Sequence, residues 1–227
     1  MSNNRIKLRR SPLEPQHEAC LPGYRVLLSA HNTCDSFIQL FDAARSTRRR
    51  STDRDQDLLR AMLVFASSGL DATIKELIAN ALPVVINAKE GNNGAALNFA
   101  TYVERYLLRD PKLAAQIISR SLTSPISRQF VISWFQEQLS KDSLQSKEQI
   151  FQVASYFDIP SRELCTDSDS LHSAFKIRNK IIHEMDVDFN HSSRSRNPRN
   201  RDDIVNAANL ILDTSEKFLR EVDKRCG

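Results

Sequence analysis

The stretch Arg178-Asn179-Lys180-Ile181-Ile182-His183 brings three chemically different polar side chains close together. Apolar residues recur at helical spacing around it, which predicts an amphipathic helix over about 171–185. At about 100° per residue, Arg178 points out of the middle of the apolar face. Asn179 lies at the edge of that face, and His183, one turn later, lies on the same side. A guanidinium, an amide and an imidazole are therefore predicted to meet near the end of one helix.

An arginine that faces a core needs a negative partner, because its charge cannot be neutralised. Arg178 therefore predicts either a site for an anionic ligand or a structural ion pair with Asp71 or Glu76. An RNA phosphate suits the first alternative, because RNA carries its own nucleophile, the 2′-hydroxyl. Cleavage then needs a proton-transfer group, a positive charge at the phosphate and a group for orientation, which His183, Arg178 and Asn179 can supply.

A metal site is the main chemical alternative, because possible ligands cluster after the helix. They are His183, Glu184, Asp186, Asp188 and His191. The run from Asp186 begins like an EF-hand loop, but it lacks the glycine at position six and the glutamate at position twelve. No zincin, nucleophile-elbow, Walker or dinucleotide glycine motif occurs. The sequence therefore predicts neither a resident metal ion nor a cofactor.

The residues above must be positioned by helices, since the 227-residue chain has only five glycines and few alternating apolar runs. Besides the motif helix, helices are predicted at 23–45, 56–82, 95–108, 111–122, 125–139, 147–157 and 201–222. Ser67, Ser68 and Gly69 predict close approach of a neighbouring helix. Residues 1–22 contain three prolines and predict a flexible or draped arm, so residues 23–227 are expected to form one all-α domain.

The net charge of +4 is modest, but positive residues gather locally. The segment 190–201 contains Arg194, Arg196, Arg199 and Arg201 and no acidic residue, which predicts either a polyanion-binding loop or a solvated one. Four scattered cysteines indicate reduced thiols. The basic N-terminus lacks the apolar core of a secretory signal, and no apolar run could span a bilayer. A cytoplasmic protein without membrane contact is expected.

Arg178-Asn179 followed by His183 after four intervening residues, late in a helix and before a loop and a closing helix, resembles the motif of the HEPN superfamily. The stretch 70–78 also resembles the second-helix region of bacterial members of the RiboL-PSP type. The resemblance covers about 20–85 and 168–225. It implies an antiparallel helical bundle, to which residues 92–160 add an inserted set of helices.

The resemblance also implies a function: a metal-independent endoribonuclease of a toxin–antitoxin or antiphage-defence system. It implies catalytic roles for Arg178, Asn179 and His183, with Asp71 as the expected acidic partner and Glu76 as the alternative. RNA binding is assigned to Lys180, Arg194, Arg196 and Arg199. The expected partners are RNA and a cognate antitoxin or defence protein. The alternative is a catalytically silent module that binds RNA, a nucleotide or a protein.

A symmetric homodimer is expected on chemical grounds as well. Internal attack by the 2′-hydroxyl needs one group to accept a proton and another to donate one, and the motif offers one histidine per chain. A two-fold axis would bring a second copy of His183 and Arg178 to the same phosphate.

Overall fold

The computed structural model describes residues 6–46, 52–88, 94–123, 127–144, 146–190 and 192–227. These residues form helices and, apart from one isolated bridge between Val187 and Arg196, no β-structure. The all-α prediction is confirmed. The elements in order are η1 (Glu18–Cys20), α1 (Leu21–Ser46), α2 (Asp53–Asn80), α3 (Leu82–Asn87), α4 (Gly94–Arg109), α5 (Pro111–Thr123), α6 (Ser127–Ser140), α7 (Lys147–Tyr156), α8 (Ser161–Leu164), α9 (Ser168–Glu184) and α10 (Arg201–Cys226).

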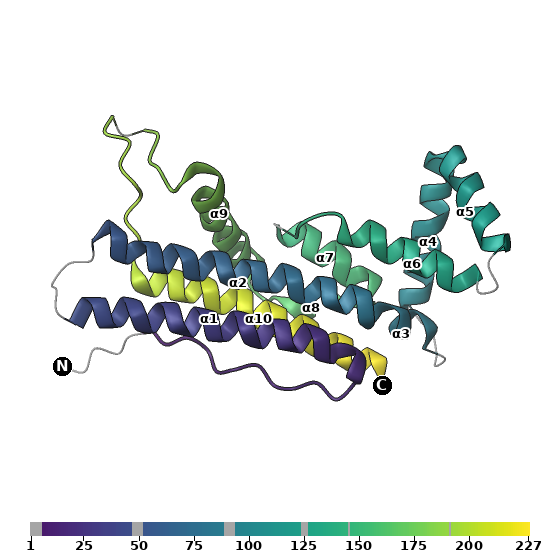
Figure 1. The fold of residues 1–227 in the computed structure, drawn as a ribbon, viewed down its shortest axis with the longest axis horizontal. Coiled ribbons are helices and arrows are strands. Elements are labelled where there is room, and N and C mark those ends of the chain that lie inside the picture. The colour runs from purple at the N-terminus through teal and green to yellow at the C-terminus, as the bar shows by residue number, and fades with distance from the viewer. Residues whose placement is uncertain (1–5, 47–51, 89–93, 124–126, 145, 191) are drawn as a thin grey trace.

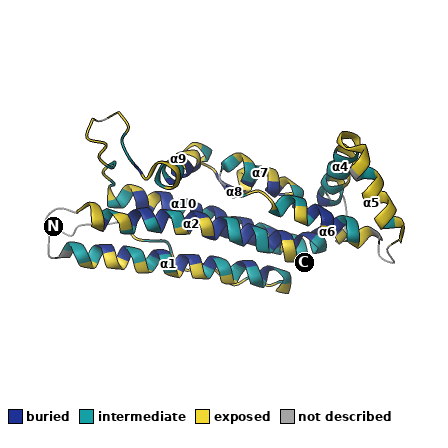
Figure 2. Cartoon of the chain, turned by 45° about the horizontal axis from the view of Figure 1, so that its top comes forward, coloured by how far each residue is buried: buried dark blue, intermediate teal, exposed yellow. Residues whose placement is uncertain are grey.

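Three long helices, α1, α2 and α10, lie side by side and form the bundle (Figure 1). Helix α1 runs antiparallel to α2, and α10 runs in the direction of α2. The buried side chains lie along the faces that these helices share (Figure 2). The predicted close approach is confirmed at Gly69, where an added Cβ would lie 2.2 Å from the Cβ of Ala30. Helix α2 is thereby held tightly against α1 and supplies a rigid support for the site.

The N-terminal arm is draped along α10 rather than free over residues 6–17. Its main chain follows α10 in the same direction: the amide of Arg9 donates to the Asn209 side chain at 2.8 Å, and that of His17 donates to the Asp223 side chain at 2.8 Å. An extended segment covers about 3.3 Å per residue and a helix about 1.5 Å, so an arm that is close to extended can follow about twice as many helix residues as it contains. The guanidinium of Arg9 also pairs with Glu216.

The inserted helices α4, α5 and α6 lie near the end of the molecule at which α2 ends, and α7 lies between them and α9 (Figure 1). Helix α9 packs on α2 and α10, and α7 contacts both α9 and α4. Ser146 caps the start of α7, because its hydroxyl accepts from the Gln149 amide at 3.3 Å. Helix α7 therefore connects the inserted helices to the motif helix. None of the helices in the described ranges is long and apolar enough to cross a membrane.

Candidate functional site

The motif lies on α9, a helix whose two faces differ in chemistry. Asp167 caps its start by accepting from the Ser170 amide at 2.9 Å. The buried face contains Leu171, Ala174 and Phe175, and the same face carries Arg178, which is 7% exposed. The predicted inward direction of Arg178 is therefore confirmed.

The polar face of α9 that adjoins the buried face lines a pocket of about 400 Å³, and Phe175 lies at the border of the two faces. Three of the predicted site residues, Asn179, Lys180 and His183, lie on its wall. The remaining lining residues are Ser146, His172, Phe175, Lys176 and Glu184. A concave site with two lysines and two histidines is suited to an anionic ligand.

Arg178 adjoins this pocket without lining it. Its Nη1 donates to Oδ1 of Asn179 at 3.0 Å, so the guanidinium reaches the pocket through that amide. Its Nε is buried and has no hydrogen-bond partner among the described residues. Burial lowers the pKa of Arg178, and the negative charge of Asp71 opposes that shift. A charged, incompletely bonded guanidinium is thus held directly behind the pocket wall.

The structure does not bring Asp71 into the pocket. The Asp71 carboxylate binds Nζ of Lys75 at 2.9 Å and accepts from the Leu144 amide at 2.7 Å. Glu76, the alternative acidic residue, accepts instead from the Asn80 side chain at 3.1 Å. Within the described part of the chain, neither carboxylate forms an ion pair with Arg178. The structural ion pair that the sequence left open is therefore absent there, and Asp71 acts on Arg178 only at longer range.

The chain leaves α9 through two residues with left-handed backbone conformation, Met185 (φ 52°) and Asp186 (φ 58°). Neither is a glycine, and such a conformation costs about 1–2 kcal/mol per residue. The Asp186 amide closes the helix end by donating to the Lys180 carbonyl at 3.0 Å. Interactions of the Asp186 side chain must therefore hold this backbone in place.

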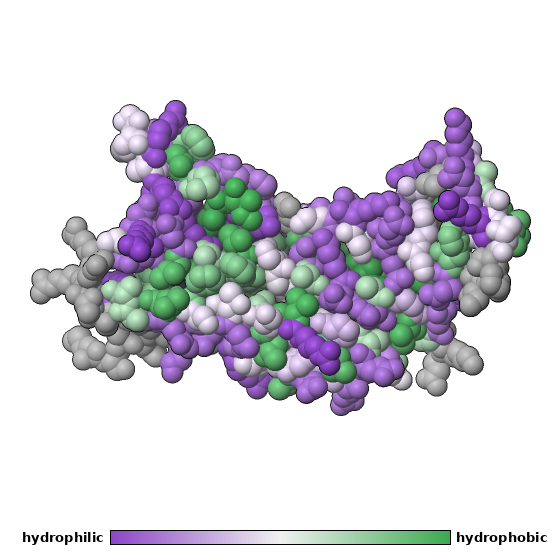
Figure 3. Space-filling model, in the orientation of Figure 1, coloured by the Kyte–Doolittle hydropathy of each residue, from purple (hydrophilic) through white to green (hydrophobic). Residues whose placement is uncertain are grey.

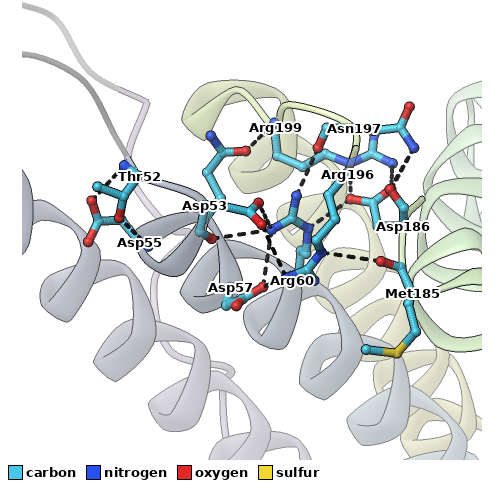
Figure 4. A network of polar contacts seen from close by, with 11 residues as sticks. Thr52, Asp53, Asp55, Asp57, Arg60, Met185, Asp186, Arg196, Asn197 and Arg199 are labelled. Atoms are coloured by element: carbon cyan, nitrogen blue, oxygen red, sulfur yellow. Dashed lines mark hydrogen bonds and ion pairs between the residues drawn. The ribbon is translucent and has the colours of Figure 1, made fainter. Parts of the chain in front are cut away.

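Those interactions form the polar network of Figure 4, with the fully buried carboxylate of Asp186 at its centre. Arg60 of α2 donates from Nε to Oδ2 of Asp186 at 2.8 Å, and Arg199 donates to both carboxylate oxygens. Arg60 further binds Asp53 at 3.0 Å and Asp57 at 3.1 Å. Burial alone would raise the pKa of Asp186, but the hydrogen bonds from Arg199 and Arg60 outweigh it and lower that pKa.

The arginines after α9 differ from the predicted RNA-binding loop. Arg199 is held by Asp186, and Arg196 binds Asp57 at 2.6 Å and the Met185 carbonyl at 3.2 Å. These contacts fasten the segment to α2 and to the end of α9, and RNA binding by Arg196 and Arg199 stays a prediction. Arg194 is exposed and lies over the Phe189 ring, 5.4 Å from its centroid. RNA binding by Arg194 stays a prediction.

The possible metal ligands after α9 are not brought together. Asp186 is occupied by two guanidinium groups, and no group of three or more His, Cys, Asp or Glu side chains in the described ranges is placed to hold a metal ion. His191 lies outside the described residues.

Three pocket-lining residues are not predicted from the sequence, His172, Lys176 and Ser146, and neither is the buried arginine of α2, Arg60. His172 and Lys176 line the pocket, and their spacing to Asn179 and His183 places all four on one helical face, a pattern that the sequence already contains. The buried Arg60 was missed as well, although it interrupts the apolar stripe of α2 in the way that Arg178 interrupts that of α9. Ser146 had no comparable signal, because only the packing of α7 against α9 brings it to the pocket.

A known protein family matches most of the chain. The RiboL-PSP-HEPN family matches residues 31–224, a range that begins after the arm and includes the inserted helices. The chain belongs to this family. No curated protein and no solved structure matches it. HEPN domains are ribonucleases or nucleotide-binding modules, and the RiboL-PSP-HEPN domain here carries its motif histidine on the wall of an open pocket.

Asp186→Asn should reduce the free energy of unfolding by about 3–5 kcal/mol, because Arg60 and Arg199 would lose the buried carboxylate that they share. The pKa of Asp186 is lowered in the folded state, so its contribution is present above the unfolded pKa of about 3.9 and is lost as pH falls through the folded value. Denaturant unfolding at pH 7 and pH 3 should show the difference shrinking in acid. Asp188→Asn, a neighbouring carboxylate outside this network, serves as the control. Equal effects of the two variants would contradict the central role of Asp186.

Arg178→Met and Arg60→Met should have opposite consequences, although both remove a buried guanidinium. Arg178→Met removes a charge with no carboxylate partner in the described structure, so stability should stay the same or rise. Arg60→Met breaks ion pairs to Asp186, Asp53 and Asp57 and should cost about 3–5 kcal/mol. Thermal melts of the two variants, side by side, make the comparison. Similar losses in both would show that Arg178 is a structural brace.

Proposed function

We propose that the chain is a metal-independent endoribonuclease that cleaves RNA by internal attack of a 2′-hydroxyl. One observation carries the proposal: His183, Asn179 and Lys180 line one open pocket, while Arg178 stands behind it with no carboxylate partner in the described structure. A buried arginine without a carboxylate is costly in a purely structural element and useful where a phosphate must bind.

Each residue has a role in this reaction. His183 transfers a proton, since imidazole is the side chain suited to that task near neutral pH. The 2′-oxygen bonds to phosphorus, the 5′-oxygen leaves and takes up a proton, and the products carry a 2′,3′-cyclic phosphate and a 5′-hydroxyl. Lys180 places positive charge at the pocket wall. Arg178 stabilises the added negative charge of the transition state when a phosphate oxygen replaces Oδ1 of Asn179 at its Nη1.

Membership of this family and the exposed motif together favour a role as a toxin or antiphage-defence effector, with a cognate antitoxin or defence protein as partner. The second candidate is a silent module that binds RNA or a nucleotide. The pocket lining favours it as well, because lysine and histidine side chains can bind a phosphate without any proton transfer.

A homodimer would complete the site. Three large apolar side chains are exposed in the short segment that contains and follows His183: Ile182 at 39%, Met185 at 66% and Phe189 at 56%. Exposed apolar surface next to polar residues is typical of interaction sites. We propose that two copies meet on these side chains, so that two His183 side chains act on one phosphate as acid and base.

His183→Ala should lower the rate of RNA cleavage by at least about 100-fold, as expected for loss of a general acid or base. The side chain is exposed, so the melting temperature should stay unchanged. Labelled RNA is incubated with each protein in EDTA, and the ends are tested for 2′,3′-cyclic phosphate.

Wild-type activity that appears only after Mg²⁺ or Mn²⁺ is added would contradict the metal-independent mechanism.

In cells, induced expression of the wild-type chain should arrest growth, and induced expression of the His183→Ala variant should not. Wild-type binding of RNA without cleavage under every condition would favour the silent module.

Met185→Glu combined with Phe189→Glu should convert the dimer into a monomer and abolish cleavage, because four carboxylates would be brought into an apolar interface. Light scattering measures the mass, and the assay above measures activity. Leu122→Glu is the matched control, since Leu122 is 81% exposed on α5, within the inserted helices. A wild-type monomer that cuts RNA would argue against a shared site. The same conclusion would follow if a mixture of His183→Ala and Arg178→Ala chains stayed inactive.

A further inference from the structure

The inserted helices carry a second concave site that the nuclease pocket does not use. Three adjoining cavities of about 120, 320 and 260 Å³ open between α4, α6 and α7, and all three are lined by Tyr102, Gln152 and Tyr156. Arg105 lines the two larger cavities, and Tyr106 and Arg109 line the largest. These six residues are called the aromatic groove below.

The rings of this groove are only partly used for packing. Tyr102 stands edge-on to Tyr156 at 5.5 Å and stacks beside Tyr106 at 6.0 Å, and it packs on the buried ring of Phe135 at 4.7 Å. Tyr102 and Tyr106 also pack on Trp134, at 6.1 and 4.9 Å. Tyr102, Tyr106 and Tyr156 nevertheless stay partly exposed and line the largest cavity. Aromatic side chains that line an open cavity are the groups on which nucleobases stack.

The charge of the groove points to the same class of ligand. Arg105 and Arg109, one turn apart on α4, are exposed and form no ion pair with any residue that the structure describes. Asp142 lines only the smallest cavity, so the two larger ones present positive charge. Aromatic faces beside unpaired arginines are typical of single-stranded nucleic-acid sites, in which rings bind bases and guanidiniums bind phosphates.

Helix α7 connects the groove to the nuclease pocket. Ser146 at its start lines the pocket, and Gln152 and Tyr156 line the groove. Ten residues of helix separate Ser146 from Tyr156, or about 15 Å, which equals about four stacked nucleotides at 3.4 Å each. Figure 3 shows the molecular surface hollowed between the segment after α9 on one side and the inserted helices on the other.

We propose that the aromatic groove binds the bases of single-stranded RNA a few nucleotides away from the phosphate held in the α9 pocket. This inference rests on the proposed ribonuclease function and deepens it. It assigns the inserted helices the task of selecting unpaired RNA, because only unpaired bases can be turned outward to stack on the tyrosines. A strand that engages both sites would pass along α7.

The test measures binding to full-length protein that carries His183→Ala, so that RNA stays intact. The probes are fluorescent oligouridylates of ten and of two nucleotides, titrated at several salt concentrations. Arg105→Gln with Arg109→Gln should weaken decamer binding and reduce its salt slope by about 1.4, or about 0.7 for each lost phosphate contact. Tyr102→Leu should weaken decamer binding about tenfold, and Tyr102→Phe, which keeps the ring, should not. The dinucleotide is too short to reach from pocket to groove, so its affinity should not change.

Arg120→Gln, an exposed arginine on α5 that does not line the groove, is the matched control. Both arginines of the groove are exposed, so their double variant should fold even if Tyr102→Leu does not. Unchanged decamer affinity and salt slope in the double variant would overturn the proposal and leave the groove to a protein ligand.

Cleavage of the decamer is scored separately with His183 intact. If the decamer is cut but its affinity does not change in the groove variants, the groove proposal is wrong and the ribonuclease proposal stands. Groove-dependent binding without any cleavage would support the groove and overturn only the ribonuclease.

Discussion

The arrangement of the candidate site depends on one buried carboxylate, that of Asp186. It lies immediately beyond the motif helix and joins three parts of the chain: α2 through Arg60, the segment before α10 through Arg199, and the end of α9 through its own amide. A buried carboxylate is stable only when its hydrogen bonds are complete, so it tolerates few alternative positions. This requirement holds the strained backbone at Met185 and Asp186 and thereby determines where α9 ends, at Glu184, the last α9 residue that lines the pocket.

The two inward arginines show how burial can serve structure or function. Arg60 is surrounded by Asp186, Asp53 and Asp57, and its charge is compensated within the chain. Arg178 has only the amide of Asn179 and the distant charge of Asp71, so within the described structure its charge has no carboxylate partner. Structural burial of a charge is completed by the fold, whereas functional burial leaves a position for a ligand.

Helix α7 gives the inserted helices a physical relation to the motif. Ser146, which caps its start, lines the α9 pocket, and its later turns contribute to the aromatic groove. The packing of α7 against α9 and α4 therefore determines the separation of the two cavities. A separation fixed by helix packing favours a ligand of matching length.

The amino-acid sequence by itself determined the helices, the inward direction of Arg178 and the family motif. These features follow from local periodicity and from the spacing of Asn179 and His183, which a helix fixes without any tertiary contact. Only the tertiary structure decided the partners of the charged groups. Arg60 and Asp186 are 126 residues apart, and Asp71 meets Leu144 across 73 residues. Sequence periodicity shows that a charge points inward, but which opposite charge meets it depends on how the helices pack.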